Sequence, residues 1–151
     1  MLRAQRTCEL AGLASDCKVD GDLQEWNYGD YEGRRSIDIC RDRPDWSLWR
    51  DGCPNGESAD QVASRVDRLL SRLGTLTGNV ALFLHGHIGA ALAIRWIGLP
   101  MIKGEHFPLN PAAIGILGSV PHHLQIRGIL MWNAAPLGTA LRGPADITIP
   151  V

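Results

Sequence analysis

Two histidines separated by one glycine, His85-Gly86-His87, are the residues whose types and spacing best suit catalytic chemistry. They follow the apolar run 80–83 and precede an amphipathic segment, 88–97. Free backbone N–H groups at a helix N-terminus bind anions, phosphate above all, and an imidazole there can donate a hydrogen bond to a phosphoryl oxygen. Gly86 would let the backbone approach such a ligand closely. The alternative is that His85 merely ends a strand, with its side chain satisfied by the backbone.

The same His-x-His spacing can also bind zinc, which requires a third and a fourth protein ligand or a water molecule. The remaining histidines, His106, His122 and His123, lie at no recognisable ligand spacing, and the four cysteines form no Cys-x-x-Cys pair. We therefore expect no metal ion and no other cofactor.

Glu25 and Arg3 are the other candidates for chemistry. A carboxylic acid beside an indole ring, as Glu25 is beside Trp26, can serve as a general acid, although four acids in this stretch compete for the role and most such side chains are simply solvated. An arginine in the first turn of a helix, as expected for Arg3, is either a surface charge or a guanidinium that holds a phosphate through paired hydrogen bonds.

The first half of the chain is expected to position Arg3 and Glu25. The sequence predicts a helix over Arg3–Leu13 that stops at Gly12, and a short strand over Lys18–Trp26. The long segment Asn27–Glu57, with one short helix near Arg34–Arg41, is expected to be a binding loop or a lid.

The clearest helix begins at Ser58, where Gln61 three residues later completes a capping box. Its apolar residues recur at helical spacing: Val62, Val66, Leu69, Leu70 and Leu73. The continuous apolar run Asn79–Leu84 predicts a buried parallel strand, and Ile88–Ile97 predicts the next helix. These elements would place His85 at the end of a strand and the start of a helix.

The last part of the chain is expected to contain two closing strands, Ala112–Leu117 and Gln125–Trp132. Residues Ala134–Val151 are rich in proline, glycine and alanine without periodicity, which predicts a loose tail. The order of helices and strands is typical of an α/β protein with a mainly parallel sheet.

Length and composition indicate one ordinary globular domain, because the chain has 151 residues and a net charge of −1. The absence of blocks of like charge argues against a nucleic-acid partner or an anionic-membrane partner. No apolar stretch is long enough to cross a membrane, and residues 1–6 lack the apolar core of a signal peptide. We expect the cysteines to be reduced thiols in a cytoplasmic protein. No oligomeric state follows from the sequence.

Four segments, taken in order, resemble the histidine phosphatase superfamily, the phosphoglycerate-mutase-like proteins. Met1–Thr7 resembles the family motif S-P-L-x-R-A-x-x-T, and Leu23–Gly33 resembles the motif L-x-E…G…E-G. Pro54–Ser58 resembles the motif P-G-G-E-S, and Leu84–Pro100 resembles the segment that carries the second histidine of the family. The resemblance implies a three-layer α/β/α domain over residues 1–133 with a mostly parallel sheet that lacks its N-terminal strands, followed by the tail 134–151.

The resemblance also implies a phosphomonoester hydrolase that forms a phosphohistidine intermediate. By position, His85 would stabilise the transferring phosphoryl group and Glu25 would protonate the leaving alcohol. Arg3, Gly86 and the backbone of His87 would bind the phosphate of a phosphorylated small molecule. Positive side chains and backbone dipoles would supply the charge stabilisation, so that no metal is required.

Two departures from the family pattern bear on activity. The 151 residues contain no Arg-His-Gly triplet, which carries the nucleophilic histidine of the family, and the chain looks as if it starts at an internal methionine. Covalent catalysis would then have no attacking group, so we expect the chain as given to be inactive. The alternatives are a non-catalytic homologue that binds a phosphorylated ligand and a non-functional truncated remnant. In addition, Gly89-Ala90 stands where the family often has an arginine.

Overall fold

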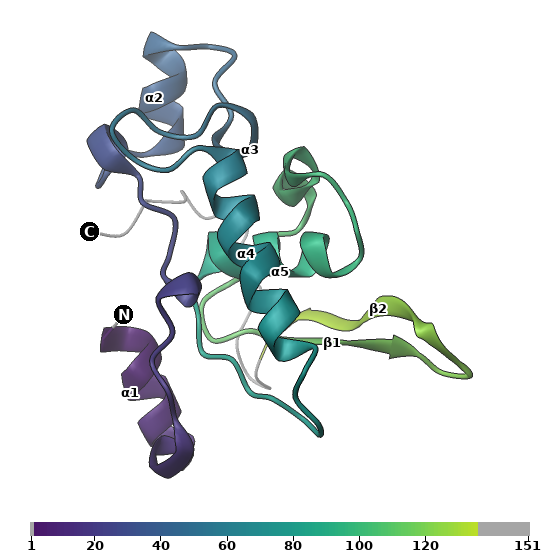
Figure 1. Cartoon of the computed structure of the whole chain (residues 1–151). Helices are drawn as coiled ribbons and strands as arrows, with labels where there is room; N and C mark the ends of the chain where they lie inside the picture. Colours follow the sequence, from purple (N-terminus) through teal and green to yellow (C-terminus); the bar gives the residue numbers. More distant parts are fainter. Residues whose placement is uncertain (1, 136–151) are drawn as a thin grey trace.

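The computed structural model describes residues 2–135, in which helices precede a β-hairpin (Figure 1). The α-helices are α1 (Leu2–Leu10), α2 (Ser36–Asp42), α3 (Leu48–Asp51), α4 (Ala59–Leu73) and α5 (Gly86–Trp96), and the strands are β1 (Ile114–Val120) and β2 (His123–Ala134). Short 3₁₀ helices lie at Ala14–Asp16, Gly21–Leu23, Gly29–Tyr31 and Met101–His106. The α/β class expected from the sequence is therefore confirmed.

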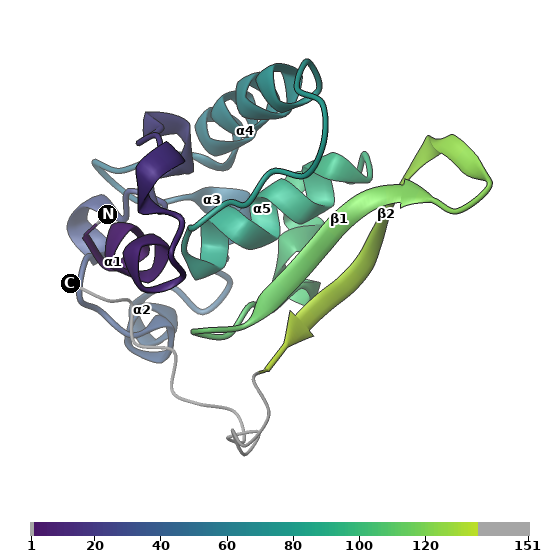
Figure 2. The same ribbon diagram turned by 90° about the horizontal axis from the view of Figure 1, so that it is seen from below.

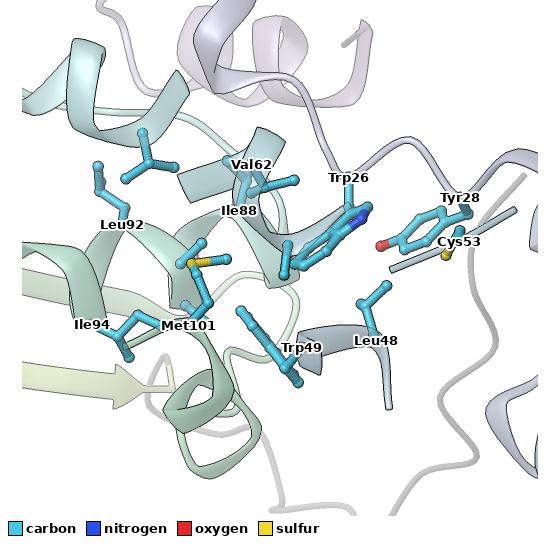
Figure 3. Close-up of a cluster of buried hydrophobic side chains, with 14 of the residues drawn as sticks. Trp26, Tyr28, Leu48, Trp49, Cys53, Val62, Ile88, Leu92, Ile94 and Met101 are labelled. Atoms are coloured by element: carbon cyan, nitrogen blue, oxygen red, sulfur yellow. The ribbon is translucent and has the colours of Figure 1, made fainter. Parts of the chain in front are cut away.

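Helix α5 lies at the centre of the molecule, between α4 on one side and the hairpin on the other (Figure 2). Its residues Ile88–Ile94 are all buried, since neighbours cover it on more than one side. Helix α4 instead presents one apolar stripe, with Val62 and Val66 fully buried against the core. The indole rings of Trp26 and Trp49 extend this core toward the N-terminus of α5 (Figure 3).

The predicted ends of two helices are confirmed. Helix α1 stops before Gly12, whose φ of 74° is a left-handed conformation that favours glycine, and the chain reverses there. At the start of α4, Ser58 Oγ accepts a hydrogen bond from the Gln61 amide at 3.2 Å, and Gln61 Oε1 accepts one from the Ser58 amide at 2.8 Å. This is the capping box expected from the sequence.

The prediction of a strand over Lys18–Trp26 is wrong. The segment contains the 3₁₀ helix Gly21–Leu23, which the Asp20 side chain caps by accepting from the Asp22 amide at 2.9 Å. Several of its carbonyl groups accept hydrogen bonds from the Arg65 guanidinium. Since these carbonyls bond to a side chain, they are not available to a neighbouring strand.

Residues 79–84 are extended, but in the described part of the chain they pair with no other strand, so the prediction of a buried parallel strand there is wrong. Val80 remains 47 % exposed. An apolar run becomes a strand only where a partner supplies hydrogen bonds. The paired strands within residues 2–135 are β1 and β2, which are antiparallel, so a mostly parallel three-layer sheet is not formed by these residues.

The two closing strands are confirmed, with Leu117 of β1 opposite Ile129 of β2. The short helix expected near residues 34–41 is present as α2. The rest of segment 27–57 is anchored by the buried rings of Trp46 and Trp49. Strand β2 extends to Ala134, and the remainder of the predicted tail, residues 136–151, lies outside the described residues.

Among the described helices, none has the length and apolar character that crossing a bilayer requires.

Candidate functional site

The carboxylate of Glu25 lies at the N-terminus of α5. Its Oε1 accepts a hydrogen bond from the Ile88 amide at 2.9 Å, and its Oε2 accepts one from the His87 amide at 3.2 Å. Helix α5 begins at Gly86, and His85, the residue directly before the helix, has an extended backbone (φ −120°, ψ 175°). A carboxylate in this position satisfies free amide groups and the positive end of the helix dipole. The amides that the sequence assigned to phosphate therefore hold the Glu25 side chain in this structure.

His85 lies close enough to Glu25 and Arg3 for both charges to act on it. Burial lowers the pKa of the His85 imidazole, the Glu25 charge opposes that effect, and the Arg3 charge adds to it, so the pKa lies below the ordinary value of 6.5. The imidazole is therefore neutral at pH 7 and has one N–H to donate. Glu25 therefore lies at the start of α5 beside His85, and the Arg3 charge acts on the same imidazole.

Arg3 lies on the exposed surface of α1. Within residues 2–135, no carboxylate forms an ion pair with its side chain, whereas many other arginines of the chain are paired. Its guanidinium is therefore available to an anion that approaches His85.

The side chain of His87 faces the core, where it meets Tyr28. The Tyr28 hydroxyl lies 2.6 Å from His87 Nδ1, and the Trp49 ring packs edge-on against the imidazole with ring centroids 5.8 Å apart. Burial lowers the pKa of His87, while burial and then the Glu25 charge raise the pKa of Tyr28 far above its ordinary value of 10. Both groups are therefore neutral at pH 7, and the hydrogen bond between the phenol oxygen and His87 Nδ1 joins two uncharged side chains.

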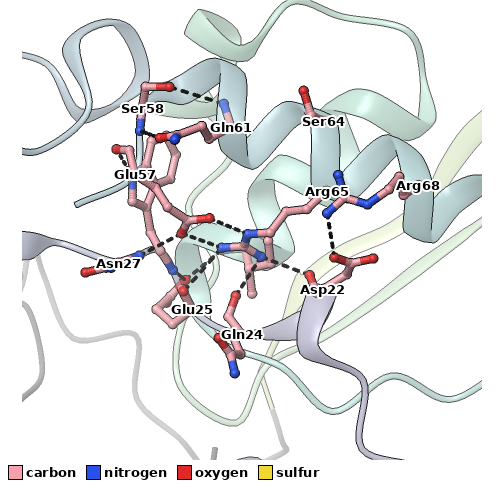
Figure 4. Close-up of polar contacts among 12 residues, drawn as sticks. Asp22, Gln24, Glu25, Asn27, Glu57, Ser58, Gln61, Ser64, Arg65 and Arg68 are labelled. Carbon is pink, nitrogen blue, oxygen red and sulfur yellow. Dashed lines mark hydrogen bonds and ion pairs between the residues drawn. The ribbon is translucent and has the colours of Figure 1, made fainter. Parts of the chain in front are cut away.

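An ion pair between the buried Arg65 and the half-buried Glu57 supports the segment that carries Glu25 (Figure 4). The pair is bidentate, with Nε–Oε1 and Nη2–Oε2 distances of 2.7 and 2.8 Å. The guanidinium also donates to three carbonyl groups at 2.9, 2.9 and 3.2 Å, those of Asp22, Gln24 and Glu25. The sequence reasoning missed this pair. Two features of the sequence could have indicated the pair: Glu57 is an acid in the Pro54–Ser58 turn, and Arg65 is an arginine on the apolar face of α4.

Two glycines allow the Pro54–Ser58 turn to pack backbone against backbone on the Glu25 segment. A Cβ atom on Gly29, whose φ is 52°, would overlap the Pro54 carbonyl, and one on Gly56 would overlap the Asn27 carbonyl. The close approach permits a 2.9 Å hydrogen bond from the Glu57 amide to the Asn27 carbonyl. The glycines therefore help to set the position of Glu57 under the site.

Gly89, where the sequence pattern suggested a missing arginine, is buried in the first half of α5. The side chains of Leu84 and Leu109 occupy the space that a Cβ atom would enter. An arginine at this position would have to displace both leucines, so the packing explains the small residue.

The arrangement combines a carboxylate and a neutral imidazole at a helix N-terminus with the charge of Arg3, whose guanidinium has no ion-pair partner within residues 2–135. Such a set can bind an anion, stabilise negative charge and donate a proton. In the part of the chain that is described, no group of three His, Cys, Asp or Glu side chains is placed to hold a metal ion.

Comparison with known proteins places this geometry in context. The family model of the histidine phosphatase superfamily (branch 1) matches residues 1–130. An acid phosphatase of Mycobacterium tuberculosis is 42 % identical over 118 residues, covering 77 % of this chain and 58 % of that protein. The sedoheptulose 1,7-bisphosphatase of Saccharomyces cerevisiae is 38 % identical, covering 68 % of this chain and 47 % of that protein. The chain thus spans about half the length of these relatives.

A solved structure of an open reading frame product from Mycobacterium tuberculosis superposes on the chain with a TM-score of 0.81. The two are 36 % identical, and the match covers 88 % of this chain and 68 % of that one. The folded arrangement of residues 2–135 is therefore shared with a larger protein.

Proposed function

The chain belongs to the histidine phosphatase superfamily, and we propose that the residues around the N-terminus of α5 form a phosphate-monoester site. One observation supports this most strongly. Glu25 and His85, which lie far apart in the sequence, meet at a helix N-terminus where Arg3 also exerts its charge. Each of the three has the chemistry that phosphoryl transfer requires of a neighbouring group.

In this proposal, His85 and Arg3 bind the phosphoryl group. The neutral imidazole donates its N–H to one phosphoryl oxygen, and the guanidinium of Arg3 donates in pairs to others. Both interactions strengthen as negative charge moves onto these oxygens. The backbone of Gly86 and His87 adds N–H donors at the positive end of α5.

Glu25 is proposed to be the acid that protonates the leaving alcohol. Its carboxylate occupies the amides of His87 and Ile88 in the structure. A phosphate group that approaches these amides competes with the carboxylate, and its negative charge favours the protonated form of Glu25. The protonated acid can then transfer its proton to the alcohol oxygen as the P–O bond breaks.

The 151-residue polypeptide by itself is proposed to bind a phosphorylated small molecule without appreciable turnover. It contains no Arg-His-Gly triplet to supply a nucleophilic histidine. Hydrolysis of phosphate monoesters requires barrier reductions on the order of 20 kcal/mol, which positioning and electrostatics alone do not supply. Non-catalytic ligand binding is the second candidate function, favoured by the exposed and unpaired Arg3 among the described residues.

The test is to assay residues 1–151, and a version extended at the N-terminus by a segment with Arg-His-Gly, on p-nitrophenyl phosphate. Phosphate binding by the 151 residues is measured in parallel by ³¹P NMR. We expect binding without turnover in the short form, with binding weakened by Arg3→Ala and by His85→Ala. Turnover by the short form that His85→Ala abolishes would show that His85 is the nucleophile instead. Absence of any phosphate binding would overturn the site.

The ligand class and the compartment are also proposals. The relatives are named for phosphatase and sugar bisphosphatase activities, so a phosphorylated small molecule is the proposed substrate class. All four cysteines are free thiols, as a reducing compartment would maintain them, and this supports action in the cytoplasm.

A further inference from the structure

We propose that Arg65 is a positioning residue that, together with Glu57, places the Glu25 carboxylate on the amides of α5. The functional meaning of this inference rests on the proposed acid role of Glu25. The placement itself does not, because it can be measured without any turnover.

Arg65 is held at the centre of the segment that carries Glu25. Its side chain is only 9 % exposed, and it donates to the Glu25 carbonyl at 3.2 Å and to the Gln24 carbonyl at 2.9 Å. These contacts fix the peptide groups on both sides of the Glu25 α-carbon. The direction in which the Glu25 side chain leaves the backbone is set by these peptide groups.

Glu57 holds the residues that follow Glu25. Its Oε2 accepts from the Asn27 amide at 2.8 Å, and its carbonyl accepts from the Trp26 indole N–H at 2.9 Å. Burial opposes ionisation of Glu57, but the hydrogen bonds from Arg65 and Asn27 outweigh it and lower its pKa. The pair therefore remains ionised at pH 7 and ties both ends of the short segment 24–27 to α4.

The position of Arg65 on α4 argues that the pair serves placement more than stability. Arg65 follows the buried residue Val62 at helical spacing and directly precedes another, Val66. Apolar residues in place of both Arg65 and Glu57 would bury apolar surface without removing charges from water, and buried ion pairs are often no more stabilising than such a replacement of both partners. The guanidinium instead provides directed hydrogen bonds to backbone carbonyls, which an apolar side chain cannot make.

The Glu25 carboxylate ends at a defined place because of these constraints. Its Oε1 accepts from the Trp26 amide at 3.0 Å as well as from Ile88, so one carboxylate joins the segment 24–27 to α5. If the backbone of this segment moved, the carboxylate would leave the α5 amides. We therefore expect loss of the Arg65 hydrogen bonds to change the environment of the His87 and Ile88 amides, although Arg65 itself bonds to Glu57 and to the carbonyls of the Glu25 segment.

The experiment follows the ¹H–¹⁵N resonances of His87 and Ile88 in the 151-residue chain through the pH range in which carboxyl groups titrate. An amide that donates to a carboxylate changes its chemical shift when that carboxylate is protonated. Glu25→Gln identifies the part of the response that comes from Glu25. Arg65→Lys retains the charge and removes the planar fork, and Arg68→Lys is the matched control on the exposed face of α4, where Arg68 pairs with Asp22.

We expect the titration of both amides to be present in the native chain and in Arg68→Lys, and to be lost in Arg65→Lys while the amides of Leu92 and Ala93 keep their native shifts. Persistence of the titration in Arg65→Lys would overturn the proposal, as would its loss in Arg68→Lys. If Arg65→Lys does not fold, the same titration is measured in Glu57→Gln, where its loss supports the proposal and its persistence overturns it. The acid role is tested separately in the version extended at the N-terminus. If Glu25→Gln leaves its rate of turnover unchanged while the amide titration is present in the native chain, the acid role alone is refuted.

Discussion

The carboxylate of Glu25 accepts a hydrogen bond from the backbone amide of Ile88 at 2.9 Å, although 63 positions separate the two residues in the sequence. This contact joins the short segment around Trp26 to the central helix α5. It also places an acidic group at the helix N-terminus, where free amide groups favour an anion. The stability of the fold and the chemistry of the site therefore depend on the same few bonds.

Replacing Glu25 by alanine is expected to lower the free energy of unfolding by about 1 kcal/mol, the usual effect of removing a side chain that caps a helix. The exposed Glu32, which lies in the same motif, is the matched control, and Glu32→Ala is expected to change stability by less than about 0.5 kcal/mol. Urea denaturation measures both. Equal effects of the two substitutions would contradict the capping role.

Replacing Arg65 by methionine is expected to destabilise the fold by about 3 kcal/mol, because Glu57 is then left partly buried without its partner. Arg68→Met, on the exposed face of the same helix, is expected to cost less than about 1 kcal/mol. The comparison requires equilibrium unfolding at pH 7. A small loss of stability in Arg65→Met would mean that water takes the place of the guanidinium as the partner of Glu57.

The pH dependence of stability is expected to include a contribution from His87. Burial lowers its pKa below 6.5, so that, as the pH falls below 6.5, the unfolded chain binds a proton that the folded chain does not. The free energy of unfolding therefore falls with pH from 6.5 down to the folded pKa, and His87 adds no pH dependence above that window. His87→Gln is expected to flatten this part of the profile, whereas the exposed His123→Gln is not.

Tyr28→Phe is expected to cost about 1–2 kcal/mol, because it leaves the buried Nδ1 of His87 without its hydrogen-bond partner. Tyr31→Phe is the control, since the Tyr31 hydroxyl contacts only the exposed Arg43 guanidinium among the described residues, and water can take its place. Thermal unfolding ranks the two variants. A Tyr28→Phe variant more stable than the native chain would show that His87 Nδ1 finds another hydrogen-bond partner.

Ser58→Ala is expected to lower the free energy of unfolding by about 1 kcal/mol through loss of the capping box of α4. Ser64, further along the same helix, donates its hydroxyl to the Asp60 carbonyl and caps nothing. Ser64→Ala is therefore expected to be neutral or slightly stabilising. Chemical denaturation of both variants, followed by circular dichroism, separates the cap from the general effect of serine in a helix.

Local rules were sufficient for several elements. The capping box at Ser58, the stop of α1 at Gly12 and the start of α5 after His85 were predictable because each depends on residues within four positions of one another. The two strands of the hairpin were predictable for the same reason, since each pairs with its neighbour in the sequence. The family was also predictable, because its motifs are short runs of neighbouring residues.

The tertiary structure decided which groups satisfy one another. The extended run 79–84 has the composition of a buried strand, but a strand depends on a partner that no local pattern supplies. The expected strand around Glu25 is instead a segment held by Arg65 from the distant helix α4. Similarly, the backbone at Gly86 and His87 was predicted from the sequence to offer free amide donors, whereas Glu25 as the acceptor of the His87 and Ile88 amides was not.

The sequence by itself therefore determined the chemistry that is available, namely a histidine before a helix, an acid beside a tryptophan and an arginine on the first helix. Only the tertiary structure decided that the acid lies at the start of α5 beside the histidine, and that Glu57 and Arg65 hold the segment that carries this acid. The physical reason is that hydrogen bonds within a helix turn or a hairpin are set by local geometry. Contacts between Glu25 and α5 exist only once the intervening segments have packed around Trp26 and Trp49.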